Sequence, residues 1–135
     1  MYNTPQRKIR HRATALVFRD NKLLLLREPV DVEFSLPGGG VEDGEPSLVA
    51  LHRELHEETG LTASSVEYLF DFCEFFGTQT TGEAWGQVHS VYLVDASGEV
   101  SLSYEHVEFE WWDGESDLPM WDYVRPMLTM LNRSE

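Results

Sequence analysis

A run of four consecutive leucines, residues 23–26, constrains the fold of this chain more than any other feature. Successive side chains of a β-strand point to opposite faces, so a strand without polar positions must be buried on both faces. The turn-forming pair Asp20-Asn21 precedes the leucines, and the apolar segment 13–18 precedes that pair. We therefore expect a hairpin of residues 13–18 and 22–27, within a sheet that helices cover on both sides.

A helix is expected between Pro46 and Gly60. Proline is tolerated in the first turn of a helix because its missing N–H needs no partner there, and glycine readily adopts the left-handed conformation just past a helix end. Between these two residues, side chains at helical spacing form the side that should face the sheet: Leu48, Leu51, Leu55 and Thr59.

Further segments complete an α/β pattern. β-Branched and aromatic residues predict strands at 66–76, 87–94 and 107–112. Residues 122–131 predict a C-terminal amphipathic helix, because apolar side chains recur there at helical spacing. The chain has 135 residues and no convincing internal linker. We therefore expect a single domain over residues 1–135, with a mixed β-sheet between helices.

The charge balance excludes some classes of function. The chain contains 24 Asp and Glu against 10 Lys and Arg, which gives a formal net charge of -14. Such a surface repels polyphosphate backbones, so we expect no stable binding to nucleic acid. A small phosphate ligand is still compatible with this charge if divalent metal ions bridge the two negative partners. Most of the acids are expected to be a solvated surface.

Other features bear on location. Cys73 is the single cysteine, so an intrachain disulfide is excluded, and its apolar neighbours predict a buried, inert thiol. Residues 1–12 lack the apolar segment of a secretory signal, and the longest aliphatic run is too short to span a bilayer. We expect a cytoplasmic protein without membrane association, and the sequence leaves monomer and homodimer open.

Three acids gather on the predicted helix between Pro46 and Gly60. Glu54, Glu57 and Glu58 stand at i, i+3 and i+4, which places them on one face, and we expect that face to point largely away from the leucine stripe. Like charges at this spacing destabilise a helix by roughly 0.2–0.5 kcal/mol per pair. Clustered carboxylates suit Mg²⁺ or Mn²⁺. A solvated acidic face is the alternative.

The spacing around these acids resembles a known motif. Gly39, Glu45, Arg53-Glu54-Leu55, Glu57-Glu58 and Gly60-Leu61 match the Nudix box, G-x5-E-x7-R-E-U-x-E-E-x-G-U with U an aliphatic residue, at every fixed position. The preceding Leu36-Pro37-Gly38 resembles the usual lead-in. The chain therefore resembles the Nudix hydrolase family, whose domains are α/β/α sandwiches with a mixed sheet.

This resemblance implies a set of site residues. Glu54, Glu57 and Glu58 would bind metal, with the carbonyl of Gly38 as an additional ligand. Arg53 would orient these acids through charge-assisted hydrogen bonds, including bonds to Glu45 and Glu57.

The resemblance also implies a reaction. A nucleoside diphosphate linked to another group would be hydrolysed with Mg²⁺ or Mn²⁺, by in-line attack of a water on the pyrophosphate. A glutamate or a metal-bound hydroxide would take the proton of that water. Outside the box, Glu105 is the first candidate for a further catalytic and metal-binding acid, and Glu108 is the second. An exposed Glu105 without a role is the alternative.

Residues outside the box give weaker signals. Arg27, at the end of the second strand, could contact a phosphate or a base, and Arg12 could do the same, although a plain surface arginine is the simpler interpretation of Arg12. Aromatic side chains could stack on a base, but aromatics in predicted strands are more often core residues: Tyr68, Phe75 and Trp85. His52 and His56 are expected at the surface, because no third ligand supports a zinc site.

The box does not encode the substrate. No proline stands between Pro46 and Pro119, which removes the signatures of NADH pyrophosphatases and of many ADP-ribose hydrolases. Phe76 and Gly77 stand where dinucleoside polyphosphate hydrolases carry a tyrosine. Nucleoside triphosphates are the first expectation by elimination, and nucleotide sugars remain open. A nucleotide-sensing Nudix-fold module and an acidic scaffold are the alternatives from other classes.

Overall fold

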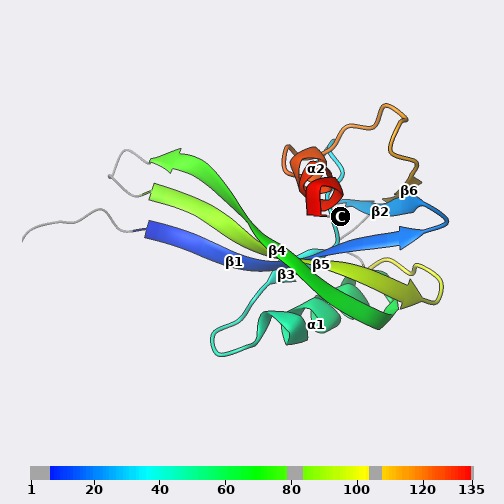
Figure 1. Cartoon of the computed structure of the whole chain (residues 1–135), viewed down its shortest axis with the longest axis horizontal. Coiled ribbons are helices and arrows are strands. Elements are labelled where there is room, and N and C mark those ends of the chain that lie inside the picture. Colours follow the sequence, from blue (N-terminus) through cyan, green and yellow to red (C-terminus); the bar gives the residue numbers. More distant parts are fainter. Residues whose placement is uncertain (1–6, 79–83, 104–107, 135) are drawn as a thin grey trace, which may run out of the picture.

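The apolar segments that predict strands form one six-stranded sheet in the computed structural model, which describes residues 7–78, 84–103 and 108–134 (Figure 1). The sheet lies between two helices, so the predicted α/β architecture is confirmed. The strands and helices are β1 (Arg7–Arg19), β2 (Lys22–Arg27), β3 (Gly38–Gly40), α1 (Ser47–Thr59), β4 (Thr62–Thr78), β5 (Ala84–Ser97), β6 (Glu108–Trp112) and α2 (Val124–Ser134).

β1 is the strand around which the sheet is organised. It pairs in parallel with β5 and antiparallel with β2 and β3, in the order β4-β5-β1-β2-β6 with β3 beside β1. The connection between β1 and β2 is the predicted Asp20-Asn21 turn. These two residues have φ angles of 53° and 63°, the left-handed values that a tight two-residue hairpin turn requires.

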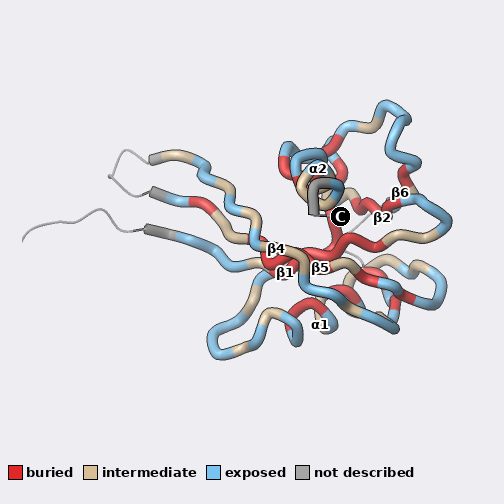
Figure 2. Tube along the Cα trace, viewed as in Figure 1, coloured by how far each residue is buried: buried red, intermediate tan, exposed pale blue. Residues whose placement is uncertain are grey.

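The leucine run of β2 contributes to a hydrophobic core on each face of the sheet. Leu24 and Leu26 pack in the core beneath α1, and Leu23 and Leu25 pack in the core beneath α2. All four are buried (Figure 2). Burying one such side chain stabilises the fold by about 1.5–3 kcal/mol. The sheet is therefore fixed between the two helices by a strand that serves both cores.

The buried face of α1 differs from the prediction at one position. Leu51, Leu55 and Thr59 are buried as expected, but Leu48 is 45% exposed and Ala50 is buried instead. Helical spacing gives the direction of a side chain around the helix axis. It does not show how far along that axis the sheet extends, and the first turn of α1 is left uncovered at Leu48.

Cys73 is a second correction. The thiol is exposed, not buried. Side chains alternate along β4, and the neighbours Phe72 and Glu74 are the partly buried ones. The apolar composition of the segment therefore did not indicate which face of the strand carries Cys73.

Candidate active site

The glycine strand β3 is held directly against β1. Gly38 pairs with Thr14, and Gly39 pairs with Ala13. Gly38 has a φ of 146°, and a Cβ there would lie 2.1 Å from the backbone oxygen of Ala13. A side chain at this position would therefore collide with the backbone of β1, so glycine is required for the close approach.

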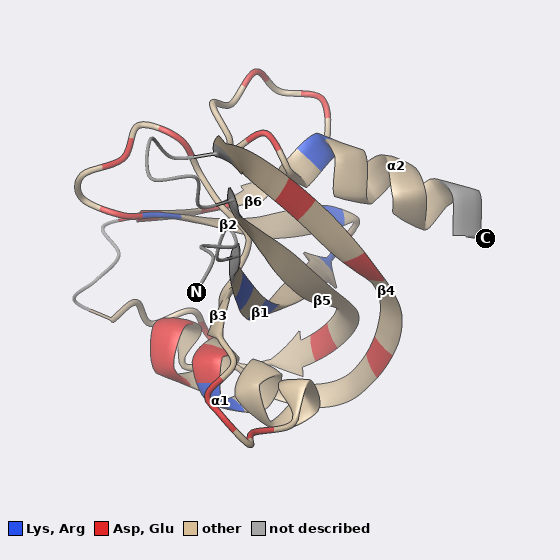
Figure 3. Ribbon diagram, turned by 90° about the vertical axis from the view of Figure 1, so that its left-hand side faces the viewer, with Lys and Arg blue, Asp and Glu red and all other residues tan. Residues whose placement is uncertain are grey.

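Two glutamates of α1 face this glycine strand. Glu58 accepts a hydrogen bond through Oε1 from the backbone N–H of Gly38 at 2.7 Å. A Cβ on Gly39 would lie 2.3 to 2.7 Å from the carboxylate atoms of Glu54, so that carboxylate occupies the space that a side chain would take. Figure 3 shows the acidic positions of α1 gathered on one half of the helix.

The orientation of these acids corrects an expectation from the sequence. Glu54 and Glu58 are partly buried beside β3, and Glu57 alone of the three is exposed. Glu58 follows Leu55 by three residues and Leu51 by seven, spacings that keep side chains on the same side of a helix. The acidic face therefore borders the leucine stripe and does not point away from it.

Arg53 connects the acids of the box. Its guanidinium donates to Glu45 at 2.9 and 3.0 Å and to Glu54 at 2.9 Å, and it lies 3.6 Å from Glu57. The hydrogen bond from Arg53 lowers the pKa of Glu45, and the same bond holds the pKa of Arg53 above its already high ordinary value. The ion pairs implied by the box are thus present, and they offset the repulsion among the acids.

The donor set fits a hard divalent cation. Carboxylate oxygens lie against a side-chain-free backbone, where a metal ion or a phosphate can approach closely. Within the described part of the chain, however, no three His, Cys, Asp or Glu side chains converge as a ready-made metal cluster. Glu105 lies outside the described residues. Glu108, the second choice, is paired with Arg27 at 2.7 Å.

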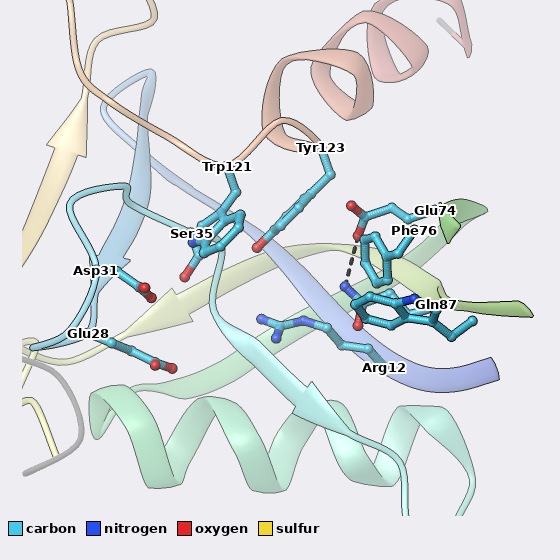
Figure 4. A pocket seen from close by; sticks show the side chains of 10 residues that line it. Arg12, Glu28, Asp31, Ser35, Glu74, Phe76, Gln87, Trp121 and Tyr123 are labelled. Atoms are coloured by element: carbon cyan, nitrogen blue, oxygen red, sulfur yellow. Dashed lines mark hydrogen bonds between the residues drawn. The ribbon is translucent and has the colours of Figure 1, made fainter. Parts of the chain in front are cut away.

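A pocket of about 420 Å³ lies beside the lead-in to the glycine strand (Figure 4). It is lined by residues from β1, β4, β5, the loop after β2 and the turn just before α2: Arg12, Glu28, Asp31, Ser35, Glu74, Phe76, Trp85, Gln87, Trp121 and Tyr123. Its volume is within the range of small-molecule sites. The sequence analysis missed Glu74, Gln87, Trp121 and Tyr123. Polar residues within the apolar strands β4 and β5 were the available signal for Glu74 and Gln87.

Arg12 is a component of this pocket and not a plain surface residue. It donates to the backbone oxygen of Leu36 at 2.9 Å and to Oγ1 of Thr14 at 3.2 Å. The N–H of Leu36 in turn donates to the hydroxyl of Tyr123 at 3.2 Å. The peptide groups of Leu36 are therefore held from both sides, which fixes the backbone two residues before Gly38.

The structure places the remaining candidate residues outside the box at different kinds of position. Arg27 bonds Glu108 and the backbone oxygen of Asp31 and is absent from the pocket lining. Aromatic residues expected in the core are instead exposed by 54%, 72% and 39%: Tyr68, Phe75 and Trp85. Of these three, Trp85 lines the pocket. His52 and His56 are exposed, as predicted.

A family model described as NUDIX domain matches residues 9–129. The chain belongs to the Nudix family. The solved structure of MutT NUDIX hydrolase from Burkholderia pseudomallei is similar to it, with 27% identity, a TM-score of 0.75, and coverage of 92% of this chain and 98% of that one. Nudix hydrolases in general use divalent metal ions.

Curated Nudix relatives match over shorter stretches. A probable DHNTP pyrophosphohydrolase of Lactococcus lactis is 44% identical over 59 residues, which are 44% of this chain and 36% of that protein. An RNA pyrophosphohydrolase of Cereibacter sphaeroides is 33% identical over 91 residues, which are 58% of this chain and 56% of that protein. The chain thus spans between about a third and somewhat over half of these relatives. Neither described helix has the length and apolar character needed to cross a membrane.

Proposed function

We propose that this Nudix protein hydrolyses the pyrophosphate bond of a nucleoside diphosphate linked to another moiety, with Mg²⁺ as cofactor and Mn²⁺ as a substitute. The observation that carries the proposal is the contact of Glu54 and Glu58 with the glycine strand, with Arg53 bonded to Glu54. A solvated acidic face would leave these carboxylates in water. Here, two of the three are partly buried against a backbone that a phosphate can approach.

The three glutamates of α1 and Arg53 each have a defined task in this proposal. Glu54, Glu57 and Glu58 would hold the metal, with the carbonyl of Gly38 as a further ligand. Bound Mg²⁺ supplies positive charge that neutralises the pyrophosphate and orients the attacking water. Arg53 keeps Glu54 in place through its 2.9 Å hydrogen bond.

The water forms a new bond to phosphorus as the bridging P–O bond breaks, and its proton passes to a basic oxygen in the site. A carboxylate outside the box is one candidate for this general base, and Glu105 is our first choice. One phosphorus product is a nucleoside monophosphate, and the other is the phosphorylated remainder of the substrate.

The pocket beside Leu36 is the proposed binding site for the nucleoside. Both curated relatives described above are named as pyrophosphohydrolases, one acting on DHNTP and one on RNA. The net charge of -14 opposes a stable complex with an RNA chain, so we favour a nucleoside triphosphate or a related small nucleotide. Arg12 is the proposed contact to substrate from the pocket, and Arg27 is a second, weaker candidate. A cytoplasmic location remains a prediction.

A panel of nucleotides incubated with Mg²⁺ tests the reaction. Nucleoside triphosphates, nucleotide sugars and dinucleotides are compared, and the products are identified by chromatography. We expect a nucleoside monophosphate from at least one class, no product in the presence of a chelator, and recovery with Mg²⁺ or Mn²⁺. Undiminished turnover in excess chelator would contradict the proposal. Binding without any product would identify a nucleotide sensor.

The position of attack is tested with ¹⁸O-labelled water. Label is expected in a phosphate product, because water attacks phosphorus and not the sugar carbon. Mass spectrometry of the products from the best substrate locates the label. If the first products from a nucleoside triphosphate are orthophosphate and a nucleoside diphosphate, the protein is a terminal phosphatase and the proposed reaction is wrong.

A further inference from the structure

A polar network runs from Arg12 to one wall of the pocket. Arg12 Nε donates to Thr14 Oγ1 at 3.2 Å, and Thr14 Oγ1 lies 2.8 Å from Nδ1 of His89. Nε2 of His89 lies 2.6 Å from Oε1 of Glu74, and Nε2 of Gln87 lies 2.8 Å from the same oxygen. Thr14 and His89 are fully buried, so every polar atom in this stretch of the network depends on its neighbour.

The chemistry of Arg12 and the tautomer of His89 together set the directions of the bonds in the network. A guanidinium can donate and cannot accept, so Thr14 Oγ1 accepts from Arg12 and keeps its own hydrogen for a second partner. Burial lowers the pKa of His89, which favours the neutral ring. A neutral ring carries one hydrogen, and the carboxylate oxygen of Glu74 lies 2.6 Å from Nε2, so that hydrogen is placed on Nε2 and Nδ1 accepts from the hydroxyl of Thr14. Oε1 of Glu74 is then the acceptor for both His89 and Gln87.

Glu74 presents its second oxygen to the pocket. The hydrogen bonds from His89 and Gln87 both end on Oε1, and no described residue donates to Oε2. The side chain is 16% exposed and lines the cavity (Figure 4). Gln87 donates to Glu74 through its amide nitrogen, whose second hydrogen is available to a ligand. The wall thus offers a fixed acceptor beside a fixed donor.

Three partly exposed aromatic rings surround this wall. Phe76, Trp85 and Trp121 are exposed by 42%, 39% and 44%, and all three line the pocket. The rings of Phe76 and Trp85 lie 4.7 Å apart between centroids. Large aromatic side chains left exposed around a cavity are typical of a site for a flat ring, which stacks on them.

A fused heterocycle of one type matches this wall. Guanine and pterins carry a ring N–H directly beside an exocyclic amino group, so two adjacent donors can approach Oε2, the carboxylate oxygen left for a ligand. A ring carbonyl on the other side can accept from an amide. Adenine and cytosine place a ring acceptor beside their amino group, and its lone pair would face the carboxylate. Uracil offers a single N–H between two carbonyls.

We propose that Glu74 is a specificity-determining residue that selects guanine or a pterin, and that His89, Thr14 and Arg12 act through it as positioning residues. The proposal rests on the proposed function for the place of the phosphates, but base recognition can be measured separately from turnover. Sites built to hydrogen-bond a group reject analogues that lack it by as much as about 10⁴-fold.

The test compares bases on the parent chain first. Guanosine, inosine, adenosine and cytidine triphosphates, and a pterin with a side-chain triphosphate, are hydrolysed under the same conditions. We expect kcat/KM to be at least about a hundredfold higher for guanosine than for adenosine or cytidine triphosphate, with inosine, which lacks the amino group, in between. The pterin arm shows which of the two heterocycles is preferred. Equal rates for guanosine and inosine triphosphates would overturn the proposal without any variant.

A variant then assigns the selection to Glu74. Glu74→Gln should reduce the preference for guanosine over adenosine triphosphate to less than about tenfold, because one of the two acceptor oxygens becomes an NH₂ group, which would face other N–H donors. The matched control is Glu67→Gln, on the same strand and exposed, which should leave the preference unchanged. If Glu28→Gln removes the preference and Glu74→Gln does not, the base is read at the opposite end of the pocket and the proposal is wrong.

Measurements of nucleotide binding distinguish a failure of this inference from a failure of the proposed function. If no nucleotide is hydrolysed, the proposed function fails, and calorimetry with guanosine, inosine and adenosine monophosphates still measures base selection by the parent chain. Selective binding of the guanosine compound would support Glu74 as the reader of the base. Equal affinities for the three would exclude it.

Discussion

Gly39 provides the sharpest test of the site at the level of a single residue. A Cβ at this position would lie 2.3 Å from the carboxylate carbon of Glu54, which is the mobile end of a flexible side chain. Gly39→Ala should therefore fold normally, with a melting temperature close to that of the parent. Its turnover should fall by about a hundredfold or more, because the methyl group displaces a proposed metal ligand. Thermal melts and a turnover assay on the same preparation measure the expected unchanged stability and the expected loss of activity.

The neighbouring glycines are matched controls for this substitution. A Cβ on Gly40 meets nothing within 4 Å, so Gly40→Ala should keep both stability and activity. Gly38→Ala should instead destabilise the fold, because its Cβ meets the backbone of β1. If Gly39→Ala retains full turnover, the contact with Glu54 has no catalytic importance.

At the level of elements, α1 depends on the residue that ends it. Gly60 has a φ of 74°, and its N–H donates to the carbonyl of His56. Alanine in the left-handed region costs roughly 1–2 kcal/mol, so Gly60→Ala should lower the free energy of unfolding by about that amount. Denaturant titration measures the change, with Gly40→Ala as the control. An unchanged midpoint would show that the strain is relieved elsewhere.

The ends of α1 could be predicted from the sequence, but the lengths of β4 and β5 could not. Pro46 and Gly60 act locally, so their effect is readable without the rest of the chain. β4 extends to Thr62–Thr78, and its register shifts at three irregularities along β5. Each irregularity breaks the alternation of faces from which a strand is recognised. Pairing with β5 extends β4 beyond its apolar centre.

The same distinction explains which parts of the site could be predicted. Arg53 and Glu54 belong to one continuous motif, and their ion pair follows from a spacing that the sequence displays. Glu74 and Tyr123 reach the pocket from elements far apart in the chain, so their proximity depends on the sheet order and on the position of α2. The residue pattern within one segment of the sequence carries no information about contacts between distant segments.

At the level of the whole molecule, the charge of -14 makes divalent cations stabilising in two ways. They screen the surface in general, and under the proposed function they would also bind the acids of α1. A ligand present at a hundredfold excess over its Kd stabilises the folded state by about 2.7 kcal/mol. We expect Mg²⁺ to raise the melting temperature more than NaCl does at equal ionic strength.

Glu58→Gln isolates the specific part of this effect. The amide oxygen of Gln can still accept from the N–H of Gly38, so the fold should persist without metal. The rise in melting temperature with Mg²⁺ should shrink toward that seen with NaCl, and Glu99→Gln, at an exposed position, should behave like the parent. An identical Mg²⁺ shift in the parent and in Glu58→Gln would show that the acids are a solvated face.

The leucine run that joins the two cores also separates two parts of the proposed site. The proposed hydrolytic acids are carried by α1 on one core, whereas Tyr123 of the base pocket packs in the other. Substitutions at distant sites without shared partners act independently. The wall around Glu74 could therefore change to read a different base while α1 keeps its acids, provided that Arg12 and Tyr123 still hold Leu36 before the glycine strand. The part of the site that would select the base and the part that would cleave the phosphates thus lie over different cores of the same sheet.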